Sequence, residues 1–149
     1  MNARATPAVF DVLRAHAFIR GESTLAVVCS QTFDQVGVLL EASFVSNGFV
    51  LVHVHEIDQM LRDAGIQLGH RSRVYEVCNA DLAAQILALD PGLAHTLPSR
   101  IAMHDRGGVV TVCTPMPTVA MVEFSHAVPV ARVARLLEAN LQRVLRGLQ

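Results

Sequence analysis

The sequence contains no lysine and no tryptophan, and only one of its 149 residues is a tyrosine. Without lysine, the chain cannot form a Schiff base through a lysine amine or build a P-loop, whose lysine contacts nucleotide phosphates. The scarcity of large aromatic side chains argues against stacking of single-stranded bases. With a formal net charge of −1, the chain has no general attraction to nucleic acid. We therefore expect no nucleic-acid partner.

The chain is also poor in cysteine and in long apolar runs. Its three cysteines, Cys29, Cys78 and Cys113, are odd in number and widely spaced, unlike a disulfide framework. Acidic and basic side chains within residues 11–16 interrupt the apolar run that a signal peptide needs. The longest uncharged run, residues 107–122, contains two prolines and is too short to cross a bilayer. These features predict a protein of the reducing cytoplasm that has no membrane-spanning segment.

What is present is the pattern of a globular domain, with 52% hydrophobic and 17% charged residues. Hydrophobic spacing predicts helices over residues 7–20, 32–46, 56–65, 79–90 and 128–148. Runs rich in β-branched residues predict strands over residues 24–30, 49–55, 72–78, 100–104 and 109–114. The predicted fold class is α+β: a single compact domain with an antiparallel or mixed sheet of about five strands and helices on one face. We divide the chain into an N-terminal helical extension, residues 1–22, and one domain, residues 23–149.

The last predicted helix, within residues 128–148, is strongly amphipathic. Its apolar stripe consists of Ala134, Leu137, Leu141, Val144 and Leu148. Four arginines lie on the opposite side, as expected of a solvated outer face. The stripe fits either the core of the same chain or the seam of a dimer, and residues 1–22 leave the same two alternatives open.

Short motifs between residues 31 and 117 carry a family resemblance. In chain order they are Gly48-Phe49 before a strand ending in His55, Gly65, Val74-Tyr75-Glu76-Val77-Cys78-Asn79, Asp90-Pro91, and Leu97-Pro98 followed by Arg100-Ile101. In this order and spacing the chain resembles the DUF302 family of small α+β domains without an established biochemical role. The resemblance implies a fold similar to the TATA-binding-protein-like class and association as a homodimer. Ser99 stands where a related subgroup has a second cysteine, which argues against a two-thiol mechanism.

The most reactive position predicted is the junction of a strand and a helix at Cys78 and Asn79. The partial positive charge of a helix N-terminus favours a thiolate, and Arg100 on a neighbouring strand can hold an anion close by. We therefore expect a ligand-binding pocket formed by His55, Cys78, Asn79 and Arg100. Cys78 is the expected catalytic residue if there is one, whereas a buried cysteine is usually inert. Cys29 and the third cysteine, within apolar strands, are expected in the core.

Histidines supply a second kind of candidate site. His53 and His55 alternate with valines, so both side chains leave the same face of a strand. With His104 from another strand, they can supply ligands to a transition metal or an axial ligand to haem. Glu56 and Asp58 lie beside them and can bind a cation or act as an acid–base pair; the ordinary alternative is service in the first turn of a short helix.

Three hypotheses of function follow from these candidates. The first is a dimeric, non-catalytic module for an unknown small molecule, with a pocket near His55, Cys78 and Arg100. The second is a metal- or haem-binding protein that uses His53 and His55. The third is a sulfur-transfer or redox protein in which Cys78 is the working thiol. The residues favour a role without catalysis, and they do not identify the ligand.

Overall fold

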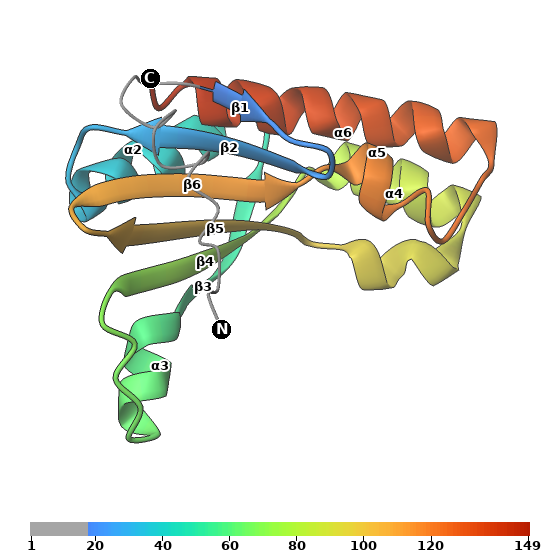
Figure 1. The fold of residues 1–149 in the computed structure, drawn as a ribbon. Coiled ribbons are helices and arrows are strands. Elements are labelled where there is room, and N and C mark those ends of the chain that lie inside the picture. The colour runs from blue at the N-terminus through green and yellow to red at the C-terminus, as the bar shows by residue number, and fades with distance from the viewer. Residues whose placement is uncertain (1–17) are drawn as a thin grey trace, which may run out of the picture.

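The computed structural model describes residues 18–149 of the chain, so most of the predicted N-terminal extension lies outside the described residues. The strands are β1 (Phe18–Arg20), β2 (Thr24–Cys29), β3 (Val50–Glu56), β4 (Arg71–Cys78), β5 (Ser99–Arg106) and β6 (Val109–Pro115). The helices are α2 (Phe33–Ser46), α3 (Ile57–Asp63), α4 (Ala80–Leu89), the 3₁₀ helix η2 (Pro91–Thr96), α5 (Pro117–Ala120) and α6 (Val128–Arg146) (Figure 1).

Within residues 18–149 the strands form one sheet in the order β1-β2-β6-β5-β4-β3, and every neighbouring pair is antiparallel. The predicted α+β class is confirmed, with six strands in place of about five. The sixth strand is β1, whose residues the sequence assigns to the end of a helix. Phe18 pairs with Val27 of β2, and the Arg146 guanidinium carbon lies 4.7 Å from the centre of the Phe18 ring. Such long-range contacts override the local helical spacing.

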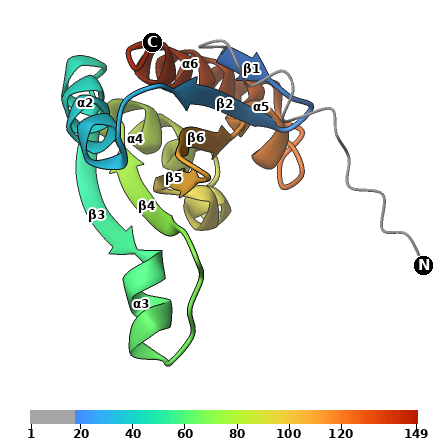
Figure 2. The same cartoon turned by 60° about the vertical axis from the view of Figure 1, so that its left-hand side comes forward.

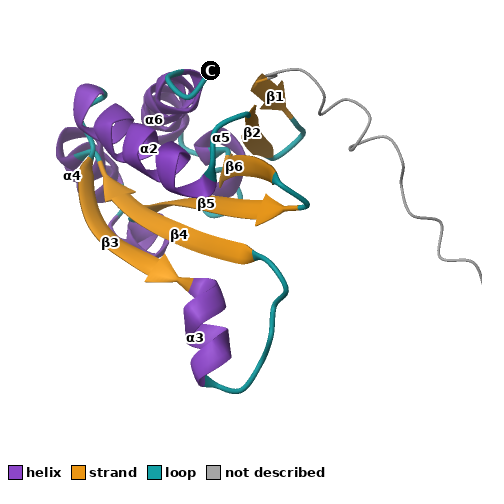
Figure 3. Ribbon diagram, turned by 90° about the vertical axis from the view of Figure 1, so that its left-hand side faces the viewer, coloured by secondary structure: helices purple, strands orange, loops and turns teal. Residues whose placement is uncertain are grey.

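Helices α2, α4 and α6 cover one face of the sheet, whereas no helix of the described chain covers the other face (Figure 2; Figure 3). Successive side chains of a strand point to opposite faces, so each strand contributes alternate residues to the covered face. The covered face supplies the buried side chains Leu25, Val27, Tyr75, Val77, Ile101, Met103, Val110 and Val112. The helices close this core with Phe33, Val36, Leu40, Phe44, Leu82 and Ile86. We call the other side the open face.

The apolar stripe of α6 belongs to this core. Ala134, Leu137, Leu141, Val144 and Leu148 are each at most 2% exposed within the single chain. Helix α6 contacts α2, α4, β2 and β6, which bury the stripe. The stripe is therefore intrachain core and is not free to act as a dimer seam, while the predicted arginine face is exposed to solvent.

The helix ends follow ordinary capping chemistry. The Thr32 hydroxyl accepts from the Gln35 N–H at 3.3 Å, and the Gln35 side chain returns a bond to the Thr32 N–H at 3.0 Å. The side-chain oxygen of Asn79 accepts from the Leu82 N–H at 3.1 Å and begins α4. Gly48, which follows the C-cap residue of α2, has a φ of 77°, a left-handed conformation that favours glycine.

Two details differ from the sequence prediction. Helices η2 and α5 were not predicted, because each is short and begins with a proline that reads equally well as the end of an element. Helix α3 extends beyond the sheet, where no other layer faces it (Figure 1). The helical spacing of residues 56–65 predicts that Met60 points inward, but its side chain is consequently 57% exposed. Among the described residues, none of the helices has both the length and the apolar character needed to cross a membrane.

Candidate functional site

Strands β5 and β6 separate at the end of the sheet where β5 begins and β6 ends (Figure 1). Their pairing stops at Ala102 and Cys113. Beyond that point β5 stays paired with β4 as far as Ser99, and β6 stays paired with β2 as far as Pro115. Pro115 has no N–H group, so it cannot donate to a ladder with β5. The two strands therefore form a fork.

Thr114 bridges the base of this fork. Its hydroxyl donates to the main-chain carbonyl of Arg100 at 2.9 Å. This side-chain bond joins β6 to β5 beyond the point where their main-chain pairing ends. Thr114 is only 1% exposed, which makes this bond part of the core. The segment that leads into β5 contains the cis peptide bond Leu97–Pro98 at the predicted Leu-Pro corner.

The fork borders a cavity of about 340 Å³ that is partly open to solvent, which we call the fork cavity. Leu137 and Met121, each 2% exposed, form its inner wall. The rings of His95 and Phe124 meet edge to face with their centres 4.3 Å apart, and Phe124 is 58% exposed, which puts this pair at the mouth. The lining residues are His95, Thr96, Leu97, Pro98, Ser99, Arg100, Thr114, Pro115, Pro117, Ala120, Met121, Phe124 and Leu137. A mainly apolar wall with a few polar groups is typical of small-molecule sites.

A cluster of polar side chains on the open face adjoins the fork cavity through Arg100. The Nε of Arg100 donates to Oε1 of Glu76 at 3.2 Å, and the same oxygen lies 3.4 Å from Nε2 of His55. His53 contacts His55 edge to face, with ring centres 4.5 Å apart. We call His53, His55, Glu76 and Arg100 the open-face cluster. Glu76, whose side chain is 16% exposed, is its centre and joins residues of β3 and β5.

The sequence model of a protein family described as "Domain of unknown function DUF302" matches residues 25–148. The chain belongs to the DUF302 family. Its fold is also that of a crystal structure of an uncharacterized conserved DUF302 protein from Bacillus stearothermophilus, with a TM-score of 0.82 over 87% of this chain and 100% of that chain. The two sequences are 21% identical, so this likeness concerns the fold. No curated protein matches the chain.

The predicted ligand residues of this DUF302 chain are only partly brought together. His55 and Arg100 meet through Glu76, and Arg100 also lines the fork cavity. Cys78 shares their sheet face, but its neighbour across the strands is Val50. Asn79 uses its side-chain oxygen to cap α4, which is a structural role. Neither Cys78 nor Asn79 is among the residues that line the fork cavity.

The three cysteines are free thiols in different surroundings. Cys29 is buried, and burial raises the pKa of its thiol to about 11. Cys113 points to the open face between Ala26 and Ala102 and is half-buried, unlike the core position expected, and burial also raises the pKa of its thiol. Cys78 is half-buried as well and lies directly before Asn79 and the N-terminus of α4.

The histidines proposed as metal ligands lie in two separate places. His53 and His55 are neighbours on β3, whereas His104 is on β5 and lies opposite Ser72 of β4. Strands are about 4.8 Å apart, so two strand spacings put His104 about 10 Å from β3. Burial lowers the pKa of His104, and the nearby charges of His70 and Arg106 lower it further. Among the described residues, no group of three or more His, Cys, Asp or Glu side chains is arranged to hold a metal ion.

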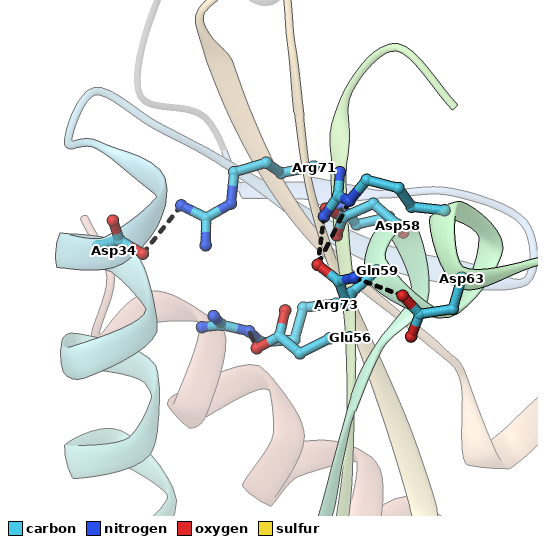
Figure 4. Close-up of polar contacts among 9 residues, drawn as sticks. Asp34, Glu56, Asp58, Gln59, Asp63, Arg71 and Arg73 are labelled. Atoms are coloured by element: carbon cyan, nitrogen blue, oxygen red, sulfur yellow. Dashed lines mark hydrogen bonds and ion pairs between the residues drawn. The ribbon is translucent and has the colours of Figure 1, made fainter. Parts of the chain in front are cut away.

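The carboxylates beside the histidines form ion pairs and hydrogen bonds with other residues of the chain (Figure 4). Glu56 pairs with Nε of Arg73 at 2.6 Å. Asp58 accepts from the Ser72 N–H at 3.0 Å and from Arg62 at 3.3 Å. The Ser72 hydrogen bond is the largest of the effects that hold the pKa of Asp58 below its ordinary value. The Ser72 bond ties α3 to β4, and the Glu56–Arg73 pair ties β3 to β4. Asp58 lies in the first turn of α3, as considered, whereas Glu56 is its N-cap residue and makes no side-chain capping hydrogen bond.

Two parts of the site were not predicted from the sequence. Glu76 was noted only as part of a motif, although its spacing two residues before Cys78 puts it on the same strand face. Alternation along β4 carries that signal, but the pairing of β4 with both β3 and β5 is needed to find its partners. The fork cavity has no local signal, since it depends on α5, η2 and the registers of three strand pairs.

Proposed function

We propose that this DUF302 chain is a non-catalytic module that binds a small, mainly apolar molecule in the fork cavity. The observation that carries the proposal is the cavity itself. Its volume of about 340 Å³ lies within the range of roughly 300–1,000 Å³ that is usual for ligand sites. Its lining is mostly apolar, and its inner wall of Leu137 and Met121 is buried. Apolar surface kept from water by a ligand in this place favours binding.

Arg100 supports an anionic group on the ligand. Its Nε is held by Glu76 at 3.2 Å, while its terminal amino groups have no acceptor among the described residues. The side chain is 71% exposed, so an incoming carboxylate, sulfonate or phosphate can reach it from solvent. Guanidinium groups bind such oxyanions through paired hydrogen bonds. We therefore expect a ligand with an apolar body in the cavity and an acidic group at Arg100.

The lining also favours binding over catalysis. It includes no Asp, Glu or Cys side chain, and its histidine, His95, packs edge to face against Phe124 at the mouth. A nucleophile with an adjacent general base is the usual requirement for covalent catalysis. The three cysteines are free thiols, which supports our proposal that the protein functions in a reducing cytoplasm.

Titration with anilinonaphthalene sulfonate tests the proposal, because this fluorescent dye combines an apolar ring system with one anionic group. We expect saturable binding of one dye per chain. Ala120 lines the cavity, so Ala120→Leu fills part of it and weakens binding by about tenfold, or 1.4 kcal/mol. Ala88 is exposed on α4 and lies outside the lining, so Ala88→Leu is the matched control. Equal affinity of the two variants, or no saturable binding by the wild type, would refute a ligand site in the fork.

The proposed partner is a second copy of the chain, bound at the free edge of β3 and the adjacent side of α2. Ser43 faces α6, since its hydroxyl donates to the Val144 carbonyl at 2.9 Å. At about 100° per residue, Val38 and Val45 lie about 140° and 160° around α2 from Ser43, away from α6. Both are exposed, at 72% and 78%. A helix side of this kind, next to an edge strand, fits a protein contact.

The edge strand continues this apolar surface. Val50 and Val52 of β3 are 62% and 54% exposed, and a bulge between Leu51 and His53 interrupts the strand. Because the bulge interrupts the row of main-chain groups along this edge, we expect apolar side chains, and not strand pairing, to form the contact. Seven strand residues at about 3.4 Å each span about 24 Å, and strand and helix layers together are about 20 Å deep. Such a face offers roughly 500 Å² per copy. Two copies together therefore bury about 1,000 Å², which is the total that a specific dimer needs.

Light scattering across a concentration series tests the dimer. Val45→Glu puts a charge into the proposed contact and is expected to give monomers at concentrations where the wild type is dimeric. Leu136→Glu replaces an apolar residue on α6 that is 52% exposed and outside this surface, so it should remain dimeric. A wild-type protein that is monomeric throughout, or a dimer that survives Val45→Glu, would exclude this arrangement.

A further inference from the structure

Helix α5 forms one wall of the fork cavity, yet its own sequence does little to hold it in place. It has four residues, Pro117–Ala120, and begins without a capping side chain, because its N-cap is Met116. Pro117, Ala120 and the following Met121 line the cavity. Helices of this length are not stable by themselves, and their first N–H groups need acceptors from elsewhere.

Glu138 of α6 supplies the missing acceptor. Its Oε2 accepts from the Thr118 N–H at 3.1 Å and also from the Thr118 hydroxyl. Thr118 is the second residue of α5, so Glu138 takes the place of an N-cap, and its negative charge lies at the positive end of the short helix. The Glu138 side chain is 5% exposed. A buried carboxylate in this position needs partners, and Thr118 provides two hydrogen bonds.

The other oxygen of Glu138 binds the N-terminal strand. Oε1 lies 2.8 Å from Nη2 of Arg20, whose side chain is 51% exposed. Glu138, Arg20 and Thr118 all line a groove of about 480 Å³ that shares no lining residue with the fork cavity. Glu138 therefore works from the side of α5 that faces away from the cavity, and it does not contact a ligand there.

We infer that Glu138 is a positioning residue of the fork cavity: it fixes α5 from outside as a cavity wall and links that wall to β1 through Arg20. The inference rests on the proposed function, because it assigns a residue that prepares the same ligand site. The physical reason is that Pro117, Ala120 and Met121 keep their places only if the helix that carries them is anchored. Loss of the anchor costs ligand affinity without removing any ligand contact.

Two measurements on four proteins test this role. The first is the dissociation constant for anilinonaphthalene sulfonate, and the second is hydrogen exchange of the amides of residues 118–121. Glu138→Leu removes both acceptors and is expected to weaken dye binding by about tenfold, or 1.4 kcal/mol, and to speed exchange in residues 118–121. Glu138→Gln keeps one acceptor oxygen for Thr118, so it should retain most of both properties. Arg20→Gln leaves the Thr118 contacts in place and should bind dye like the wild type.

The outcomes separate this inference from the proposed function. If the wild type binds no dye, the proposed function fails, but faster exchange of residues 118–121 in Glu138→Leu still supports the anchoring of α5. Unchanged exchange and unchanged dye affinity in Glu138→Leu would overturn the inference. If Glu138→Leu does not fold, Thr118→Val replaces it: it removes the hydroxyl donor and keeps the N–H donor to Glu138. We then expect a smaller rise in the exchange of residues 118–121, and equal exchange in Thr118→Val and wild type would contradict the role. A Glu138→Gln variant as impaired as Glu138→Leu would show that charge, and not the cap, is what matters.

Discussion

Replacement of Thr114 by valine tests the structural basis of the fork. Valine has nearly the same shape, so the change removes the hydroxyl that donates to the Arg100 carbonyl at 2.9 Å and leaves the packing in place. Thr114 is 1% exposed, and water cannot easily replace its hydroxyl. A buried acceptor left unsatisfied costs about 1–3 kcal/mol. Because Arg100 itself is exposed, we expect the lower part of that range, about 1–2 kcal/mol.

Urea unfolding followed by circular dichroism measures this loss. With an m-value of about 2 kcal/mol/M, a loss of about 1–2 kcal/mol lowers the unfolding midpoint by about 0.5–1 M. Thr111→Val is the matched control, because Thr111 is on the same strand and half-buried on the open face. Valine suits a strand at least as well as threonine, so the control should keep or raise the wild-type midpoint. Equal midpoints for the two variants would refute the view that the Thr114 hydroxyl holds the fork.

Three further predictions concern groups near the site. The Ser72 N–H and Arg62 hold the pKa of Asp58 below its ordinary value of 3.8, so this carboxylate stabilises the fold at neutral pH and the contribution is lost as the pH falls through the lowered pKa. Asp58→Asn should therefore flatten the acid side of a plot of urea midpoint against pH, and a slope like that of the wild type would contradict this. Because burial raises the pKa of Cys29 to about 11 and also that of Cys113, iodoacetamide at mildly alkaline pH should label Cys78 first; peptide mass spectrometry that finds Cys29 labelled equally fast would contradict it. Asn79→Ala should lose about 1 kcal/mol of stability with the cap of α4 while dye affinity stays unchanged, and a selective loss of affinity would return Asn79 to the ligand site.

The parts of the fold that local chemistry determines could be predicted from the sequence. The Asn79 cap, the positive φ of Gly48 and the stripe of α6 follow from residue types and spacing. The strand β1 could not be predicted, because Phe18 and Arg20 are held by α6 residues more than a hundred positions away. A helical period in the sequence carries no information about such a partner.

The candidate site was only half accessible to sequence reasoning. His55 and Arg100 were expected together, and they meet through the carboxylate of Glu76. The expected contribution of Cys78 to the same pocket has no counterpart in the lining of the fork cavity. The cavity arises because β5 and β6 leave each other after Ala102, a matter of register that involves β2 and β4 as well. No single segment encodes that separation.

Native mass spectrometry of the wild type and of Ala120→Leu, both as purified, is the most direct test of a ligand site in the fork cavity. We expect the wild-type spectrum to contain one small molecule per chain in addition to the polypeptide mass. We expect this added mass to be absent or strongly reduced in Ala120→Leu, where leucine occupies part of the cavity of about 340 Å³. A wild-type spectrum with only the bare chain mass, or an added mass that persists unchanged in Ala120→Leu, would refute a ligand site in the fork cavity.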